Sequence, residues 1–310
     1  MPGTSSTSDL PPTSEFGASP DAIQFHYDVG TDFYQLWLDP SLTYSGAMWD
    51  GVDGDESETS VLAAAQRVKI LYHLDQAGVD EGCRLLDVGC GWGGLLAVAT
   101  GERRAGPAVG LTLSRDQADH IAGLGLARTE VRLESWRDHQ PAEGYDAIVS
   151  IGAFEHFAQR GLRPAERTRA YADFFARCFE WLPERGRLSL QTIGLDDEVE
   201  SDGPIAGFYA SDVFPDSTPP RLAEIVTACD RYFSVTALRN DGDQYARTLH
   251  GWTVRLQARR ADAEALVGGD TYRTYVRYLR VSRAMFRRRT CTLYRITMER
   301  RPRPLPEAAA

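Results

Sequence analysis

The chain has 310 residues, of which 43% are hydrophobic and 25% are charged, and its formal net charge is −10. This composition is typical of a globular protein with a sizeable core, and length alone does not choose between one domain and two. The negative charge argues against nucleic acid or an anionic lipid surface as an electrostatic partner. A local basic cluster at Arg287, Arg288 and Arg289 is the exception, and such a run is usually a solvated face.

The five cysteines include no CxxC pair, so neither a disulfide framework nor a zinc signature is expected. They lie mostly in apolar runs, where buried free thiols are the natural interpretation. No window approaches 18 apolar residues, and the N-terminus lacks the charged and apolar regions of a signal peptide. We therefore expect a cytoplasmic protein without a transmembrane segment.

Composition along the chain predicts one domain between two flexible ends. Residues 1–20 are rich in Ser, Thr, Pro and Gly and predict a disordered arm, and residues 301–310 predict a flexible tail. The domain is expected to span 21–300. Within it, the aromatic-rich stretch 21–60 predicts a cap over a site, and 195–220 and 243–288 are expected to be additions on the acceptor side.

Apolar strands and helices alternate through the middle of the chain, which indicates a doubly wound, mostly parallel sheet. Residues 60–77 have the apolar spacing of a helix. A helix should follow Ser114 as far as 124, and further helices are expected at 165–182, 244–267 and 271–287. Strands are expected at 84–88, 108–113, 130–133, 146–151, 187–193 and 290–298.

A glycine-rich loop follows the first of these strands and opens a helix. Gly89, Gly91 and Gly93 allow the backbone to turn sharply and to approach a ligand closely. A dinucleotide fingerprint would read G-x-G-x-x-G, with an acid at the end of the second strand. Here the spacing is G-x-G-x-G-G, the second strand ends at Thr112, and the acid, Asp87, precedes the first glycine. This arrangement favours S-adenosylmethionine over a dinucleotide.

Several spaced motifs in the same order resemble the cyclopropane fatty acid synthase family, including the mycolic acid cyclopropane synthases. The resemblance implies a Rossmann-like class I methyltransferase fold, with a doubly wound, mostly parallel seven-stranded α/β sheet and helical cap additions. It also implies methyl transfer from S-adenosylmethionine to an alkene carbon. The motifs that carry it are 26–28, 33–34, 38–40, 43–45, 86–94, 111–114 with Gln117, 150–157, Tyr245, 248–249, Trp252 and 275–286.

The resemblance also implies a set of cofactor contacts. The amino-acid end would meet Tyr44 and Ser45, the ribose Thr112 and Gln117, and the adenine Ser135 and Trp136. A plainer interpretation makes Trp136 a core aromatic residue and Tyr44 and Ser45 the start of a helix. The full expected set is Tyr27, Tyr44, Ser45, Asp87, Gly89, Gly91, Gly93, Thr112, Gln117, Ser135, Trp136 and Ile151.

The acceptor side departs from the family pattern. The family holds a bicarbonate ion with a cysteine, a glutamate, a histidine and a tyrosine. The glutamate and the tyrosine correspond to Glu155 and Tyr245, whereas Gly46 replaces the cysteine and Gln191 the histidine. Ser282 replaces a further cysteine. These changes argue against bicarbonate-assisted ring closure, and they leave Glu155 as the candidate general base, with Tyr245 and Gln191 beside it. The plainer interpretation of Glu155 is a structural, hydrogen-bonded acid.

We therefore expect carbon methylation of an isoprenoid, polyketide or unsaturated acyl chain through a carbocation, which aromatic side chains would stabilise. Cyclopropanation of a fatty acyl chain is the alternative, and O- or N-methylation or binding without catalysis are further ones. No metal site is expected. The acidic run 196–202 could hold Mg²⁺ only if the acceptor carries a diphosphate. A homo-oligomer is compatible with the sequence.

Overall fold

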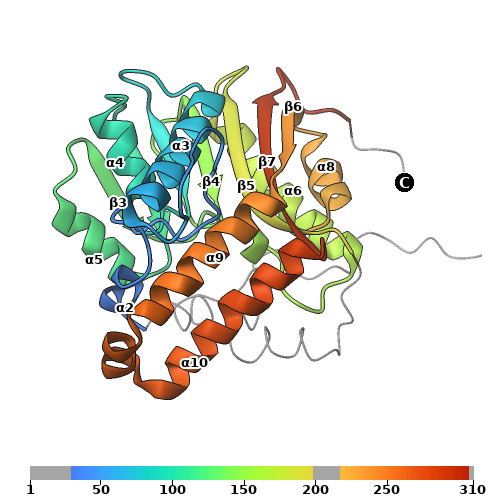
Figure 1. Cartoon of the computed structure of the whole chain (residues 1–310). Coiled ribbons are helices and arrows are strands. Elements are labelled where there is room, and N and C mark those ends of the chain that lie inside the picture. The colour runs from blue at the N-terminus through green and yellow to red at the C-terminus, as the bar shows by residue number, and fades with distance from the viewer. Residues whose placement is uncertain (1–28, 198–216, 307–310) are drawn as a thin grey trace, which may run out of the picture.

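The computed structural model describes residues 29–197 and 217–306, which form an α/β fold around a seven-stranded sheet (Figure 1). The strand order is β3-β2-β1-β4-β5-β7-β6. Neighbouring strands are parallel except that β7 runs antiparallel to both β5 and β6. The strands are β1 (Leu85–Val88), β2 (Ala108–Thr112), β3 (Thr129–Leu133), β4 (Ala147–Ile151), β5 (Arg187–Leu195), β6 (Phe233–Asn240) and β7 (Cys291–Arg300).

Helices cover both faces of the sheet because successive strand residues point to opposite sides. Leu86 and Ile148 pack with α6 (Pro164–Trp181) and α8 (Leu222–Cys229) on one face. Leu85 and Ala147 pack on the other face with three further helices. These are α3 (Thr59–Ala77), α4 (Gly94–Gly101) and α5 (Arg115–Leu124). The apolar strands predicted from the sequence are thus buried on both sides.

A third, aromatic-rich cluster lies at the carboxyl ends of the parallel strands. It joins α2 (Thr31–Gln35) to two long helices, α9 (Gly242–Ala258) and α10 (Arg260–Arg287), which run side by side below the sheet in Figure 1. Phe33, Tyr34 and Trp37 are fully buried in it. The short 3-10 helix η2 (Phe154–His156) follows β4 at the same edge. No helix of the described ranges is long and apolar enough to cross a membrane.

The predicted fold class is confirmed, and most predicted elements appear within two residues of their expected bounds. The prediction at 244–267 is wrong, because α9 ends at Ala258 and Arg259 leaves the helical conformation. α10 in turn has a non-helical residue at Gly268, whose φ is 78°. The ranges predicted from the sequence also omitted α8 and β6. β6 is an edge strand with several exposed apolar side chains, so it lacks the buried run that marked the other strands. The termini and the segment 198–216 lie outside the described residues.

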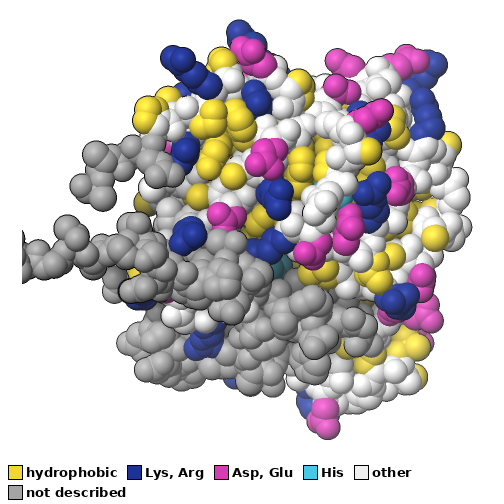
Figure 2. Space-filling model, turned by 180° about the vertical axis from the view of Figure 1, so that it is seen from behind, with side chains coloured by type: hydrophobic (Ala, Val, Ile, Leu, Met, Phe, Trp, Pro, Cys, Tyr) yellow, Lys and Arg dark blue, Asp and Glu magenta, His cyan; other side chains and the backbone are white. Residues whose placement is uncertain are grey.

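Surface charge is mixed. On the face seen in Figure 2, acidic and basic side chains lie interspersed with apolar ones. On the described part of this face, the basic side chains do not gather into one large patch.

The antiparallel strand β7 brings a fully buried arginine into the centre of the molecule. Arg295 is 0% exposed and forms an ion pair with Asp241, at the start of α9. Its other nitrogens donate to the side-chain oxygen of Gln191 at 2.9 Å and to the carbonyl oxygens of Gly46 and Ala47 at 3.2 and 2.9 Å. A buried guanidinium is tolerated only when it is paired and hydrogen-bonded in this way. Arg295 therefore ties the loop at 46–47 to the sheet and to α9.

We predict that Asp241→Ala lowers the free energy of unfolding by about 3 kcal/mol, because it leaves a buried guanidinium without its counter-charge. Urea denaturation monitored by circular dichroism measures the change. The matched control is Asp230→Ala, which breaks an exposed pair with Arg301 and should cost less than about 1 kcal/mol. Equal effects of the two substitutions would contradict this account of Arg295.

Candidate cofactor and active site

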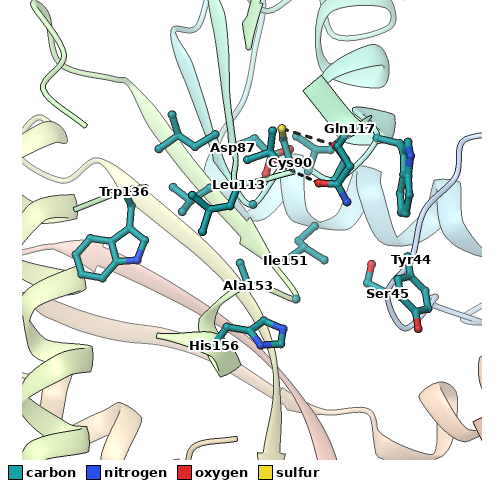
Figure 3. A pocket seen from close by; sticks show the side chains of 18 of the residues that line it. Tyr44, Ser45, Asp87, Cys90, Leu113, Gln117, Trp136, Ile151, Ala153 and His156 are labelled. Atoms are coloured by element: carbon teal, nitrogen blue, oxygen red, sulfur yellow. Dashed lines mark hydrogen bonds between the residues drawn. The ribbon is translucent and has the colours of Figure 1, made fainter. Parts of the chain in front are cut away.

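A cavity of about 440 Å³ opens at the carboxyl ends of β1, β2 and β4. The strand order reverses between β1 and β4, and open α/β sheets bind ligands at such a point. In Figure 3, Trp136 lies at one end of the cavity and Tyr44 and Ser45 lie at the other, with Asp87 and Gln117 between them. Segments distant in the sequence thus line a single elongated site.

The glycine loop between β1 and α4 forms the floor of this cavity. Gly89 and Gly91 line it, and both have positive φ values, of 83° and 54°. A Cβ atom added to Gly89 would lie 2.5 Å from the Cβ of Ala153, so only glycine fits there. Gly93 lies outside the lining, contrary to the expected cofactor contact, and its backbone packs against Ile121 of α5. Its role is the turn into α4, which begins at the next residue.

Two buried ionisable side chains line the cavity between the glycine loop and Ser45. Asp87 lies beside the glycine loop because it belongs to β1, and burial raises the pKa of its carboxyl to about 7. Lys69 of α3 lines the same part of the cavity, and burial lowers the pKa of its ammonium to about 7. The Lys69 ammonium donates to the Ser45 hydroxyl at 2.7 Å. Lys69 is not among the residues expected at the site from the sequence, although it stands at a buried position of the predicted helix.

Lys69 belongs to a polar stripe on the buried face of α3, which we define as Gln66, Lys69 and His73. The side chain of Gln66 donates to the carbonyl oxygens of Thr43 and Ser45 at 3.1 and 2.9 Å. His73 bonds the hydroxyl of Ser189 and the side-chain oxygen of Gln191, on β5. Residues three and four apart share one helix face, so the stripe aligns the loop 43–45 with the sheet.

Polar and aromatic groups continue along the cavity from Asp87. The hydroxyl of Thr112 donates to the side-chain oxygen of Gln117 at 2.7 Å, and both residues line the cavity. Ser114 caps α5 and accepts from the backbone N–H of Gln117, as the sequence predicted for the helix start. Trp136, at the far end, packs against Phe157 and Phe174, so it is a core aromatic residue as well as a wall of the cavity.

These residues fit S-adenosylmethionine in the order that its parts require. The charged pair Asp87 and Lys69 suits the amino-acid end, the side chain of Gln117 suits ribose hydroxyls, and the ring of Trp136 suits a purine. Of the expected cofactor residues, the cavity brings together Tyr44, Ser45, Asp87, Gly89, Gly91, Thr112, Gln117, Ser135, Trp136 and Ile151. Tyr27 lies outside the described residues.

Glu155 lies on η2, next to Gly152, which lines the cavity. A Cβ atom added to Gly152 would lie 3.7 Å from the Cβ of Ser45 and 3.9 Å from Oε1 of Glu155. The Glu155 carboxylate is 6% exposed, and its Oε2 accepts from the hydroxyl of Thr192 at 3.0 Å. Burial raises the pKa of this carboxyl to about 7, although the hydrogen bond from Thr192 lowers it. A carboxyl with this pKa can accept a proton near neutral pH.

The structure places Gln191 away from the position expected for a catalytic residue. Like Glu155 and Tyr245, Gln191 is outside the cavity lining, but its side chain points to α3, where it accepts from Arg295 and His73 and donates to the carbonyl oxygen of Gly46. Successive residues of a strand face opposite sides, so the neighbour that reaches Glu155 is Thr192. Alternation along β5 indicates from the sequence that Gln191 and Thr192 face opposite sides, but not which of the two faces the site.

Tyr245 occupies the space beside Gly46. A Cβ atom added to Gly46 would lie 2.9 Å from Cγ of Tyr245 and 2.8 Å from Cδ2 of Leu293. The ring of Tyr245 also packs on Phe286 and Trp252, with centroids 4.7 and 6.0 Å away. A cysteine at position 46 would therefore collide with this ring. The glycine found at position 46, where the family pattern has a cysteine, therefore fits a wall in which the ring of Tyr245 fills the space.

The aromatic wall near Glu155 is built around Tyr44. Its ring contacts those of Trp37 and Trp252, each with a centroid distance of 5.3 Å. Its hydroxyl group bonds that of Tyr278, which in turn bonds Ser282. Within the aromatic-rich stretch 21–60, Phe25 and Tyr27 lie outside the described residues. The indole N–H of Trp49 donates to the backbone carbonyl of Gln244 and to the hydroxyl of Thr248.

The metal interpretation of the acidic run has no support in the described ranges. There, no group of three or more His, Cys, Asp or Glu side chains is placed to hold a metal ion. Asp196 accepts from the hydroxyl of Tyr294 at 2.9 Å, and Glu198, Glu200 and Asp202 lie outside the described residues.

Comparisons with known proteins agree on one family. The family model described as mycolic acid cyclopropane synthetase matches residues 17–296. Cyclopropane mycolic acid synthase 2 of Mycobacterium leprae is 35% identical over 301 residues, which cover 90% of this chain and 93% of that protein.

Solved structures give the same result. The cyclopropane synthase MmaA2 of Mycobacterium tuberculosis has a TM-score of 0.81 and 30% identity, and the match covers 92% of this chain and 99% of that one. The mycolic acid cyclopropane synthase CmaA1 complexed with SAH and CTAB has a TM-score of 0.80 and 32% identity, with the same coverage. The chain therefore belongs to the mycolic acid cyclopropane synthetase family and is an S-adenosylmethionine-dependent methyltransferase of the class I fold.

Proposed function

We propose that this enzyme alkylates a double bond in a long unsaturated acyl chain and that deprotonation then closes a cyclopropane ring. The observation that carries the proposal is the buried carboxylate of Glu155, which lies behind Gly152 at the Ser45 end of the cofactor cavity. The relatives, which are named as cyclopropane synthases, support ring closure better than the methylation without ring closure expected from the sequence. Among the expected acceptors, they support an unsaturated acyl chain better than an isoprenoid or a polyketide.

The reaction requires that the methyl donor and the alkene be aligned and that the carbocation be protected from water; it does not require a nucleophile from the protein. S-adenosylmethionine would supply an electrophilic methyl group: the π electrons of the alkene would form the new carbon–carbon bond while the methyl–sulfur bond breaks and S-adenosylhomocysteine leaves. The acceptor would be left with a carbocation, which the ring of Tyr44, held in place by Trp37 and Trp252, would stabilise while excluding water. Glu155 would then remove a proton from the transferred carbon, and the C–H electrons close the ring.

Gln191 is better placed to act indirectly. Its bonds to His73, Arg295 and the carbonyl oxygen of Gly46 support the loop that precedes Ala47, and none of them reaches the cavity. We therefore assign it a positioning role. Tyr245 forms the wall next to Gly46 and would shape the acceptor space.

A second candidate is methylation of an alkene without ring closure, on an acyl or other specialised acceptor. It is favoured by the repacked wall, because the ring of Tyr245 fills the place where a cysteine side chain at position 46 would stand. In this reaction the proton leaves a carbon next to the cation, and a new double bond forms. The base can be the same carboxylate of Glu155.

Products distinguish the two candidates. We predict that lipids of a bacterial host expressing the enzyme gain one methylene per modified chain, and that proton NMR shows the upfield methylene signals of a cyclopropane. A host carrying the Glu155→Gln variant is the control. An allylic methyl signal without upfield signals would support the second candidate. A methyl label found on oxygen or nitrogen would contradict both.

We predict that Glu155→Gln lowers kcat by about 100-fold or more while the affinity for S-adenosylhomocysteine stays within about twofold, because only the base is removed. Turnover of labelled cofactor and isothermal titration calorimetry measure the two quantities. Thr192→Val is the companion variant and should have a smaller effect, since it removes only a hydrogen bond to the base. Unchanged kcat in Glu155→Gln would remove Glu155 from the mechanism.

The rate should depend on pH through Glu155. Its pKa is raised to about 7, and the ionised form is the base. We therefore expect kcat to fall as the pH drops below about 7 and to level off above it. In Thr192→Val the lost hydrogen bond should move this midpoint upward, because that bond favours the charged form. A flat profile between about pH 6 and 8 would contradict the assignment.

A further inference from the structure

Lys69 is the only lysine in a chain of 310 residues, and it is 1% exposed. Its ammonium has three N–H donors, and in the described part of the chain one hydrogen bond is made, to the Ser45 hydroxyl at 2.7 Å. A buried charge with one neutral partner is costly unless another group completes its shell. Because Lys69 lines the cofactor cavity, that group can be a ligand.

The charges around Lys69 leave its positive charge largely unbalanced. Arg295 of β7 disfavours the charged form of Lys69 and lowers its pKa. His73, which is on the same helix as Lys69, is kept neutral because burial lowers its pKa. Two carboxylates act on it from a distance, Asp39 and Asp87. Asp39 is committed to the loop, since it accepts from the backbone N–H groups of Ser41 and Thr43.

Asp87 is the carboxylate that shares the cavity with Lys69. It is buried and forms no side-chain hydrogen bond or ion pair with the described residues. Two opposite charges therefore line the same cavity close enough to interact, and neither has a direct charged partner among the described residues. This arrangement is complementary to a zwitterion, which can give its carboxylate to the lysine and its ammonium to the aspartate.

We propose that Lys69 binds the carboxylate of the cofactor's amino-acid end, with the Ser45 hydroxyl beside it and Asp87 facing the ammonium. This assignment is independent of the acceptor and would hold for either candidate reaction. The competing explanation is that Lys69 only orients Ser45. Orienting Ser45 needs a hydrogen-bond donor but no charge. The two explanations therefore differ in whether loss of Lys69 weakens the binding of a ligand that lacks the carboxylate.

The charge pair also predicts how affinity changes with pH. The pKa of Lys69 is about 7 before binding, and a bound carboxylate would raise it, so affinity should fall as the pH rises above about 7. The pKa of Asp87 is also about 7, and a bound ammonium would lower it, so affinity should fall as the pH drops below about 7. The affinity for a zwitterionic ligand should therefore peak near pH 7.

Calorimetry with two ligands tests the proposal. We predict that Lys69→Met weakens binding of S-adenosylhomocysteine by roughly 30-fold or more but leaves binding of 5′-methylthioadenosine, which lacks the amino-acid end, within about twofold. Arg67→Met is the matched control on the exposed side of α3, where Arg67 pairs with Glu102, and it should change neither. The retained binding of methylthioadenosine also shows that the variant is folded. Equal losses for both ligands, or no loss for either, would overturn the proposal.

The single lysine allows a direct second measurement. In protein labelled with ¹³C-lysine, the one side-chain Cε signal should titrate near pH 7 in the free enzyme. The midpoint should rise by at least one pH unit with S-adenosylhomocysteine and stay unchanged with methylthioadenosine. A midpoint that does not respond to S-adenosylhomocysteine would show that no carboxylate reaches Lys69. Should Lys69→Met fail to fold, this titration of the wild-type protein decides the question alone.

Discussion

The wall of the cofactor cavity near Ser45 depends on polar side chains that a helix directs into the core. The polar stripe of α3, Gln66, Lys69 and His73, bonds the loop 43–45 on one side and β5 on the other. Such groups are stable in a core only if their hydrogen bonds are made, so the helix, the loop and the sheet must all be in register. The stripe therefore couples the position of Ser45 to the position of the strands.

The acceptor side follows from the same constraint. Arg295 is bonded to Gln191, which is bonded to His73 and to the carbonyl oxygen of Gly46. With its backbone held there, Gly46 leaves room for the ring of Tyr245 and no room for a side chain of its own. A change at position 46 is thus linked to the packing of α9. The glycine at position 46 is thus explained by this packing, and Glu155 lies near Gly152, 3.9 Å from where a Cβ at that glycine would stand.

Burial also sets the pKa values of the ionisable groups on the cofactor side and on the acceptor side of the site. Asp87 and Lys69 have pKa values near 7 because water is excluded from them, and the same cause brings the Glu155 carboxyl to about 7. Groups that titrate near neutral pH can exchange protons or respond to a ligand's charge at little cost. The carboxyl ends of the parallel strands thus hold two groups: the pair Asp87 and Lys69, which line the cofactor cavity, and Glu155, the candidate base for the acceptor.

The sequence by itself determined the fold class, the order of most strands and the glycine loop, because these follow from local periodicity and from backbone conformations that only glycine adopts easily. It also predicted most of the residues that line the cavity, through motifs that are contiguous in the chain. Only the tertiary structure decided which strand residues face the site. Gln191 points to α3 and Thr192 to Glu155, and Lys69 enters the cavity, because these directions depend on how strands and helices pack rather than on spacing along one segment.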